Sequence, residues 1–143
     1  MNETKAVNYL ETVPELMQAL AGVHEMLLGQ GLDRKLHHLV QLRASQMNLC
    51  GFCVKMHTAE ARQDNETNDR LDRLVVWRSV DDFSDTERAA LAWTEAITEL
   101  KPDTDYAALR RDLRVHFTEH EIGSLTVAAS MINLWNRINV SRH

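Results

Sequence analysis

The sequence predicts an all-α protein, a single domain of six or seven helices that takes in residues 1–143. Three observations support this fold class. Glycine and proline number only 5 and 2, too few for the many tight turns of a β-fold. Apolar residues recur at three- and four-residue intervals, the period of a helix with one buried face. Two segments carry a capping box, in which a Ser or Thr side chain and a Glu three residues later satisfy backbone N–H groups of the first turn.

The first half of the chain supplies four of the expected helices. Pro14 is well tolerated in a first helical turn, and the apolar repeat that follows it stops at Gly29–Gly31, where glycine favours a helix end. Asp33 can cap the next helix through its side chain. The later three helices are expected from Asp33 to about Met47, from about Cys50 to Gln63, and from Thr67 or Asn68 to Arg78.

The second half supplies the capping boxes. Ser84 with Glu87 opens a helix that runs to Leu100, and Pro102 follows its end. Thr118 with Glu121 opens a last helix that reaches about Val140, and a shorter helix is expected between the two. The last helix is apolar on more than one face, so it must be central or meet another subunit. The shorter helix carries Tyr106, Leu109 and Leu113, and the last carries Ile122, Leu125, Val127, Ile132, Leu134, Trp135 and Ile138.

Charge and hydropathy exclude several classes of partner. The chain has 16 basic and 21 acidic residues, a net charge of −5 and a pI near 5.8, so it lacks the basic face that nucleic acid or an anionic membrane requires. No stretch approaches the roughly 20 apolar residues of a membrane span, and the start lacks the features of a signal peptide. We therefore expect a cytoplasmic protein, in a compartment where paired cysteines are rarely structural disulfides.

The two cysteines, Cys50 and Cys53, are the most informative residues. In a helix that begins near Cys50, they share one face with His57, at positions i, i+3 and i+7. Cα atoms at this spacing lie on the order of 5 Å apart, so a disulfide can open and close with little backbone movement. A helix N-terminus and a nearby imidazole both favour a thiolate, which peroxide oxidises to a sulfenic acid and a neighbouring thiol converts to a disulfide.

Two other interpretations of the cysteines remain open from the residues alone. They can be small buried hydrophobic side chains. They can also join His116 and His120, whose spacing suits two ligands on one helix face, in a metal site. The sequence contains no glycine-rich phosphate loop or dinucleotide fingerprint, so no bound nucleotide, flavin or other cofactor is expected.

The cysteine segment resembles the core motif of the AhpD-like alkylhydroperoxidases, which belong to the carboxymuconolactone decarboxylase-like superfamily. The motif spans Leu42–Cys53 and continues through Met56–Thr58. Ala89–Ala96 and Asn133–Arg137 resemble two further blocks of the small, peroxidase-related branch, so that the likeness covers roughly residues 10–140. It implies an all-helical fold, assembly into trimers or hexamers, and a cycling CxxC pair that reduces hydrogen peroxide or small organic hydroperoxides.

The resemblance also implies a role for each site residue. Cys53 would attack the peroxide, Cys50 would resolve it as a disulfide, and His57 would relay the proton. The residues alone leave the order of the cysteines open, because Cys50 lies nearer the helix start and can be the more acidic thiol. The family usually has a glutamate where this chain has His38, so either His38 takes over that place in the relay or Glu60, one turn beyond His57, substitutes.

Electrons for such a cycle must come from outside the chain, and a lipoyl-type dithiol or a thioredoxin-like protein is the expected donor. Two other functions are alternatives. One is a redox-sensing helical oligomer without turnover of its own. The other is a lyase like carboxymuconolactone decarboxylase, which is disfavoured because its chemistry has no evident use for a CxxC pair.

Overall fold

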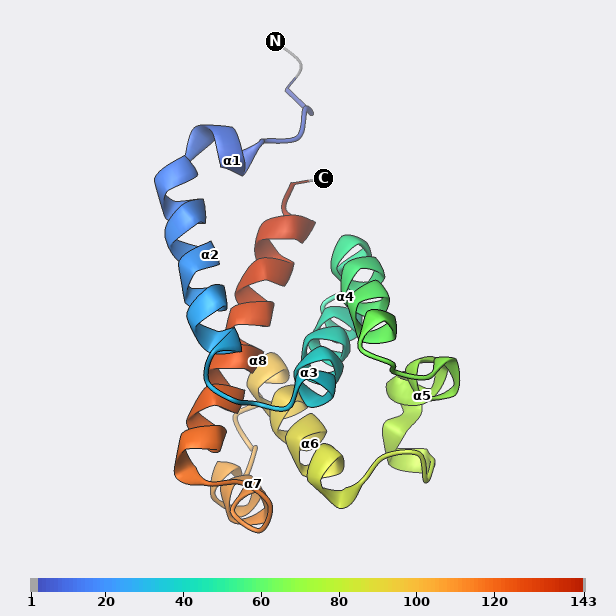
Figure 1. The fold of residues 1–143 in the computed structure, drawn as a ribbon. Coiled ribbons are helices and arrows are strands. Elements are labelled where there is room, and N and C mark those ends of the chain that lie inside the picture. Colours follow the sequence, from blue (N-terminus) through green and yellow to red (C-terminus); the bar gives the residue numbers. More distant parts are fainter. Residues whose placement is uncertain (1–2, 143) are drawn as a thin grey trace.

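The computed structural model describes residues 3–142, and within that span the chain forms eight α-helices, one 3-10 helix and no strand (Figure 1). The all-α prediction is confirmed, with slightly more helices than the six or seven expected. No helix in this span is both long enough and apolar enough to cross a membrane. The elements are α1 (Tyr9–Thr12), α2 (Pro14–Leu28), α3 (Arg34–Met47), α4 (Gly51–Gln63), α5 (Asn68–Arg73), η1 (Leu74–Ser79), α6 (Asp85–Glu99), α7 (Tyr106–Leu113) and α8 (Glu119–Val140).

The additional elements have local causes. The short helix α1 starts where the Asn8 side chain accepts a hydrogen bond from the Leu10 N–H, a cap that apolar periodicity does not reveal. The single helix expected up to Arg78 divides into α5 and η1, and Val76 in η1 has non-helical dihedrals of −119° and 27°. Two adjacent β-branched residues, Val75 and Val76, lose side-chain freedom in a helix, which favours a break there.

The capping predictions are confirmed atom by atom. The Asp33 carboxylate accepts a hydrogen bond from the Leu36 N–H at 2.9 Å. Ser84 and Thr118 each take part in a complete capping box, in which the Glu three residues later accepts from the backbone N–H of the cap residue. These caps fix where α3, α6 and α8 begin.

Helix α3 lies at the centre of the fold, packed against α4, α6 and α8 (Figure 1). Leu39 and Val40, adjacent in its second turn, are both fully buried and point about 100° apart around the helix axis. Val40 belongs to an apolar cluster with α6 and α8, and Leu39 to a second cluster with α4, α5, η1 and α6. Because both clusters share α3, the segment that leads into the cysteines is held rigidly.

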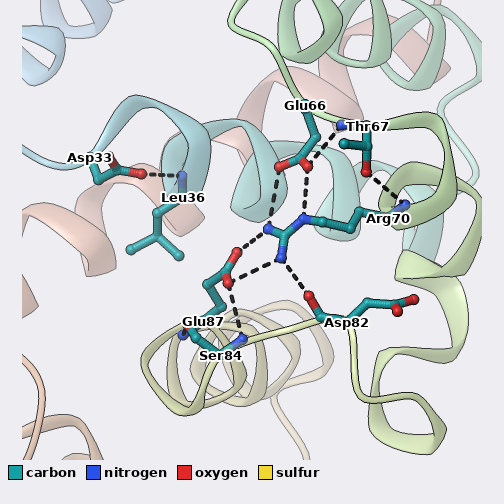
Figure 2. A network of polar contacts seen from close by, with 8 residues as sticks. All are labelled: Asp33, Leu36, Glu66, Thr67, Arg70, Asp82, Ser84 and Glu87. Carbon is teal, nitrogen blue, oxygen red and sulfur yellow. Dashed lines mark hydrogen bonds and ion pairs between the residues drawn. The ribbon is translucent and has the colours of Figure 1, made fainter.

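Helix α5 is fastened to α6 by Arg70 (Figure 2). The Arg70 guanidinium pairs with Glu66 at 2.7 Å, pairs with Glu87, and donates to the carbonyl oxygen of Asp82. Glu87 is also the partner of Ser84 in the capping box, so one carboxylate serves both the cap and the ion pair. The network joins α5 to α6 on the side of the domain that lies away from the two chain ends.

Candidate active site

The site is built on the hairpin of α3 and α4. His38, near the start of α3, is hydrogen bonded to Asp64, directly after the end of α4, so the two helices run antiparallel. The chain reverses at Leu49, whose φ of 55° lies in the left-handed region that a leucine rarely adopts. Cys50 then takes the N-cap position of α4, and its sulfur accepts a hydrogen bond from the Cys53 N–H at 3.3 Å.

Three asparagines secure this reversal against α8. Asn48 donates to the side-chain oxygens of Asn133 and Asn136, both at 2.9 Å. Asn136, which is fully buried, donates in turn to Ser45 on α3 at 2.9 Å. The position of the cysteines therefore depends on side chains some 85 residues further along, on the last helix.

Cys50 and Cys53 form a disulfide, with their Cα atoms 5.3 Å apart as the helical spacing predicts. Both residues are buried, with 2% and 1% of their surface exposed. Of the two, Cys53 lines a cavity of about 400 Å³ between α1, α2, α4 and α8. The pair is thus reached from solvent through this cavity and from the side of Cys53.

The cavity has a long apolar wall and a few polar groups. His57 and Glu60 follow Cys53 along α4 and line the cavity with it, and Gln41 comes from α3. The apolar wall is formed by Leu10, Met17, Ala21, Phe52, Met56, Ile132, Trp135 and Ile138, and the remaining polar side chains are Tyr9, His24, Glu25, Asn139 and Arg142.

His57 is arranged as a base. It is 4% exposed, and its Nδ1 lies 3.0 Å from the Glu60 carboxylate, which accepts the Nδ1 proton and leaves Nε2 as the basic nitrogen. Burial lowers the pKa of His57 below its usual 6.5, Glu60 opposes that effect, and His38 and His24 lower the pKa further. His57 is therefore neutral at pH 7 and able to accept a proton.

His38 has a carboxylate partner that the sequence did not indicate. Its Nε2 lies 2.6 Å from Asp64, and Arg34 pairs with the same carboxylate at 3.2 Å. The hydrogen bond from His38 lowers the pKa of Asp64, so the carboxylate is ionised and His38 carries its proton on Nε2. The Nδ1 of His38 is buried and has no hydrogen-bond partner among the described residues. The two candidates for the relay, His38 and Glu60, thus belong to separate histidine–carboxylate pairs.

Two more histidines, His24 and His37, lie near His38, and sequence reasoning gave neither of them a role; of the two, His24 lines the cavity. The rings of His24 and His37 are 6.1 Å apart, and those of His37 and His38 are 6.5 Å apart. Burial, together with the charges of His24, His38 and His57, lowers the pKa of His37 to about 4. Two consecutive histidines in a helix rich in apolar residues could have indicated that His37 belongs near the site. The approach of His24, which belongs to α2, depends on tertiary packing and could not be predicted in this way.

The metal-site interpretation of the cysteines is wrong. His116 is hydrogen bonded to Thr86 at 3.1 Å, and His120 lies 3.3 Å from the Gln30 carbonyl oxygen, away from the cysteines. Within residues 3–142, no group of three or more His, Cys, Asp or Glu side chains is arranged to hold a metal ion.

The chain has the features of a helical thiol protein. Its fold is all-helical, and a CxxC disulfide lies at a helix N-terminus, under a cavity and near a histidine–carboxylate pair. Residues 14–96 match the carboxymuconolactone decarboxylase family. The chain belongs to this family, and the AhpD-like resemblance drawn from the sequence is confirmed. Family membership and the Cys50–Cys53 disulfide fit a peroxidase-like role.

Curated relatives and a solved structure extend this similarity to the whole chain. The chain is 33% identical to YdfG of Bacillus subtilis (strain 168), an uncharacterized protein, over 96% of this chain and 94% of YdfG. It is 36% identical to the uncharacterized YnjA of Escherichia coli (strain K12) but spans only 59% of that protein. A solved structure is also similar, that of ATU0492 from Agrobacterium tumefaciens, a protein of unknown function and candidate antioxidant defence protein AhpD. It superposes with a TM-score of 0.92 at 35% identity and covers 97% of this chain and 95% of ATU0492.

More distant solved structures share the fold. An uncharacterized peroxidase-related protein with an AhpD core, from Ralstonia eutropha JMP134, has a TM-score of 0.79 at 23% identity and covers 90% of this chain and 69% of its own. The debrominase Bmp8 has a TM-score of 0.75 at 19% identity, over 92% of this chain and 73% of Bmp8. Proteins with this helical architecture carry names that refer to different reactions. The activity of this chain must therefore be argued from its own site.

Proposed function

We propose that the protein is a thiol peroxidase that reduces hydrogen peroxide or organic hydroperoxides by cycling the Cys50–Cys53 pair. The observation that carries the proposal is the common cavity of Cys53 and His57, with Glu60 bonded to the imidazole. A nucleophile, a neutral base and a group that orients the base are the parts that thiolate chemistry needs. They meet here in one partly apolar space.

In the first step, His57 accepts the proton of the Cys53 thiol. The thiolate then attacks the terminal oxygen of the hydroperoxide, so that an S–O bond forms while the O–O bond breaks. The alkoxide that leaves takes the proton back from His57. The products are a Cys53 sulfenic acid and an alcohol, or water when the substrate is hydrogen peroxide.

In the second step, Cys50 attacks the sulfur of the sulfenic acid, the disulfide forms, and water leaves. The N-cap position suits Cys50 to this role, because the Cys53 N–H and the helix N-terminus both stabilise a thiolate there. The same stabilisation makes Cys50 the better leaving group when the disulfide is reduced again. The more acidic thiol is then the resolving one, and the thiol that lines the cavity is the attacking one.

We further propose that His38 takes part in this proton relay, together with Asp64. The bond to Asp64 holds the His38 proton on Nε2 and leaves Nδ1 as a buried acceptor. His38 lies near enough to His57 for its charge to lower the pKa of His57. Asp64 and Arg34 lie at the surface end of the hairpin, which suits a proton exit to solvent.

The burial of both sulfurs favours one of the two expected electron donors. A reductant must reach Cys53 at the inner wall of the cavity, and this suits a slender dithiol of the lipoyl type better than a cysteine on the surface of a thioredoxin-like protein. The dithiol attacks Cys53, expels the Cys50 thiolate, and closes its own disulfide, so two electrons pass to the protein. A dithiol cycle needs a reducing compartment, which supports the cytoplasm as its place.

We also propose a homo-oligomer, a trimer or hexamer, in which α2 is covered. Within α2 only Leu27 is buried, whereas Leu16 and Met26 are 63% and 70% exposed. Large apolar side chains gathered on one helix of a water-exposed surface are typical of protein interfaces. Sedimentation at micromolar concentration should give an assembled species, and a monomer would refute this part of the proposal.

The test of the catalytic proposal is a free-thiol count on the reduced protein, before and after one equivalent of hydroperoxide. The wild type should lose both thiols rapidly, Cys53→Ser should form no intramolecular disulfide, and His57→Ala should react markedly more slowly. His116→Ala, an exposed histidine remote from the cavity, is the matched control and should react like the wild type. Two surviving thiols would refute the proposal. Disulfide formation without sustained turnover, in the presence of a dithiol, would instead favour a redox sensor.

A further inference from the structure

The cavity is lined by charged groups of both signs. Where the C-terminal end of α8 meets α1, Tyr9 is hydrogen bonded to Ser141 at 3.0 Å. Arg142 follows Ser141 directly and lines the cavity. The carboxylates of Glu60, beside His57, and of Glu25, next to His24 in α2, line it as well. Arg142 therefore brings a positive charge into the cavity that holds Cys53.

Arg142 has no partner for its side chain within the described part of the chain. Its Nε is buried and makes no hydrogen bond, and its guanidinium forms no ion pair with any of residues 3–142. Buried donors are nearly always satisfied in folded proteins. An unsatisfied arginine that lines a cavity therefore indicates an anionic or strongly polar acceptor that is supplied from outside.

The rest of the cavity lining is largely apolar, with Trp135 and Ile138 of α8 and Met17 of α2 among its residues. A hydrocarbon segment fits such a wall.

We propose that Arg142 is a carboxylate-binding residue and that the preferred substrates are organic hydroperoxides that carry a carboxylate at the other end of a hydrocarbon segment. This inference rests on the proposed peroxidase function. Arg142 pairs with the carboxylate, the hydrocarbon segment lies against the apolar lining, and the hydroperoxide reaches Cys53.

A binding experiment tests the subsite without turnover. The oxidised wild-type protein is titrated calorimetrically with octanoate and with octanol, which differ in charge but share a chain length. Octanoate should bind about tenfold more tightly than octanol, and Arg142→Gln should remove that difference. Arg111→Gln, which deletes the same charge from an exposed position on α7, should preserve it. Equal affinities for the two ligands in the wild type would overturn the proposal.

A turnover experiment separates this inference from the proposed function. Octanoate with a terminal hydroperoxide and its methyl ester are compared as substrates of wild type, Arg142→Gln and Arg142→Lys. The acid should have about a tenfold higher kcat/KM than the ester in the wild type, little preference in Arg142→Gln, and a partial preference in Arg142→Lys. Equal turnover of both substrates would overturn the carboxylate preference alone. Absence of turnover, with octanoate binding intact, would overturn the peroxidase while leaving the carboxylate site in place.

Discussion

His37 offers a direct test of the electrostatics of the site. It is only 5% exposed on α3, and its pKa is lowered to about 4, first by burial and then by the neighbouring His24, His38 and His57. In the unfolded chain its pKa returns to the usual 6.5. Between these two values the unfolded state binds more protons than the folded state, so the folded protein loses stability as the pH falls through this window.

The size of the effect follows from the two pKa values. Each pH unit of the difference between 6.5 and about 4 corresponds to roughly 1.4 kcal/mol, which gives about 3 kcal/mol for the whole window. At pH 7.5 His37 causes no loss of stability, because it is neutral in both the folded and the unfolded state. At pH 4.5 most of the window has been crossed, so the free energy of unfolding should fall by about 2.5 kcal/mol because of His37 alone.

The assay is urea unfolding of the oxidised protein at pH 7.5 and pH 4.5, with wild type and His37→Leu side by side. Leucine fills the space without an ionisable group, so the variant should lose about 2.5 kcal/mol less on acidification than the wild type. His116→Leu, at an exposed position, should show the full wild-type loss. Identical losses in wild type and His37→Leu would refute the view that His37 is held neutral in the fold.

Two further predictions concern other charged groups. Arg70→Met removes the cation between two carboxylates, so the free energy of unfolding in urea should fall by about 2 kcal/mol, whereas the exposed Arg111→Met should leave it nearly unchanged. Glu60→Gln removes a group that raises the pKa of His57, so the acid limb of kcat/KM against pH should move to lower pH; a move to higher pH would contradict the role of Glu60.

The fold was predictable from the sequence where local chemistry decides it. The side chains of Asp33, Ser84 and Thr118 each accept a hydrogen bond from the backbone N–H three residues later. Such bonds can be predicted from a short segment of sequence. Helix α1 and the break at Val76 were missed for the opposite reason. A helix of 4 residues has no apolar period to recognise, and a break between α5 and η1 depends on small backbone preferences that packing can reverse.

The candidate site was predictable only as far as one helix carries it. Cys50 caps α4, Cys53 and His57 belong to it, and their spacing places them on a common face. The pairing of His38 with Asp64 spans 26 residues and depends on the register of α3 against α4, which no short-range pattern encodes. Arg142 reaches the cavity only because α8 returns beside α2 and α4, so its place had no sequence signal at all.

The resemblance to the AhpD-like proteins places a glutamate where this chain has His38, and this exchange changes the charge around His57. A carboxylate at that position would stabilise a protonated His57, whereas His38 lowers the pKa of His57. This chain instead gives His57 its own carboxylate, Glu60, and gives His38 another, Asp64. In the proposed mechanism, burial and His38 keep the base His57 neutral at pH 7 and Glu60 orients it, which are the two properties that proton removal from a thiol requires.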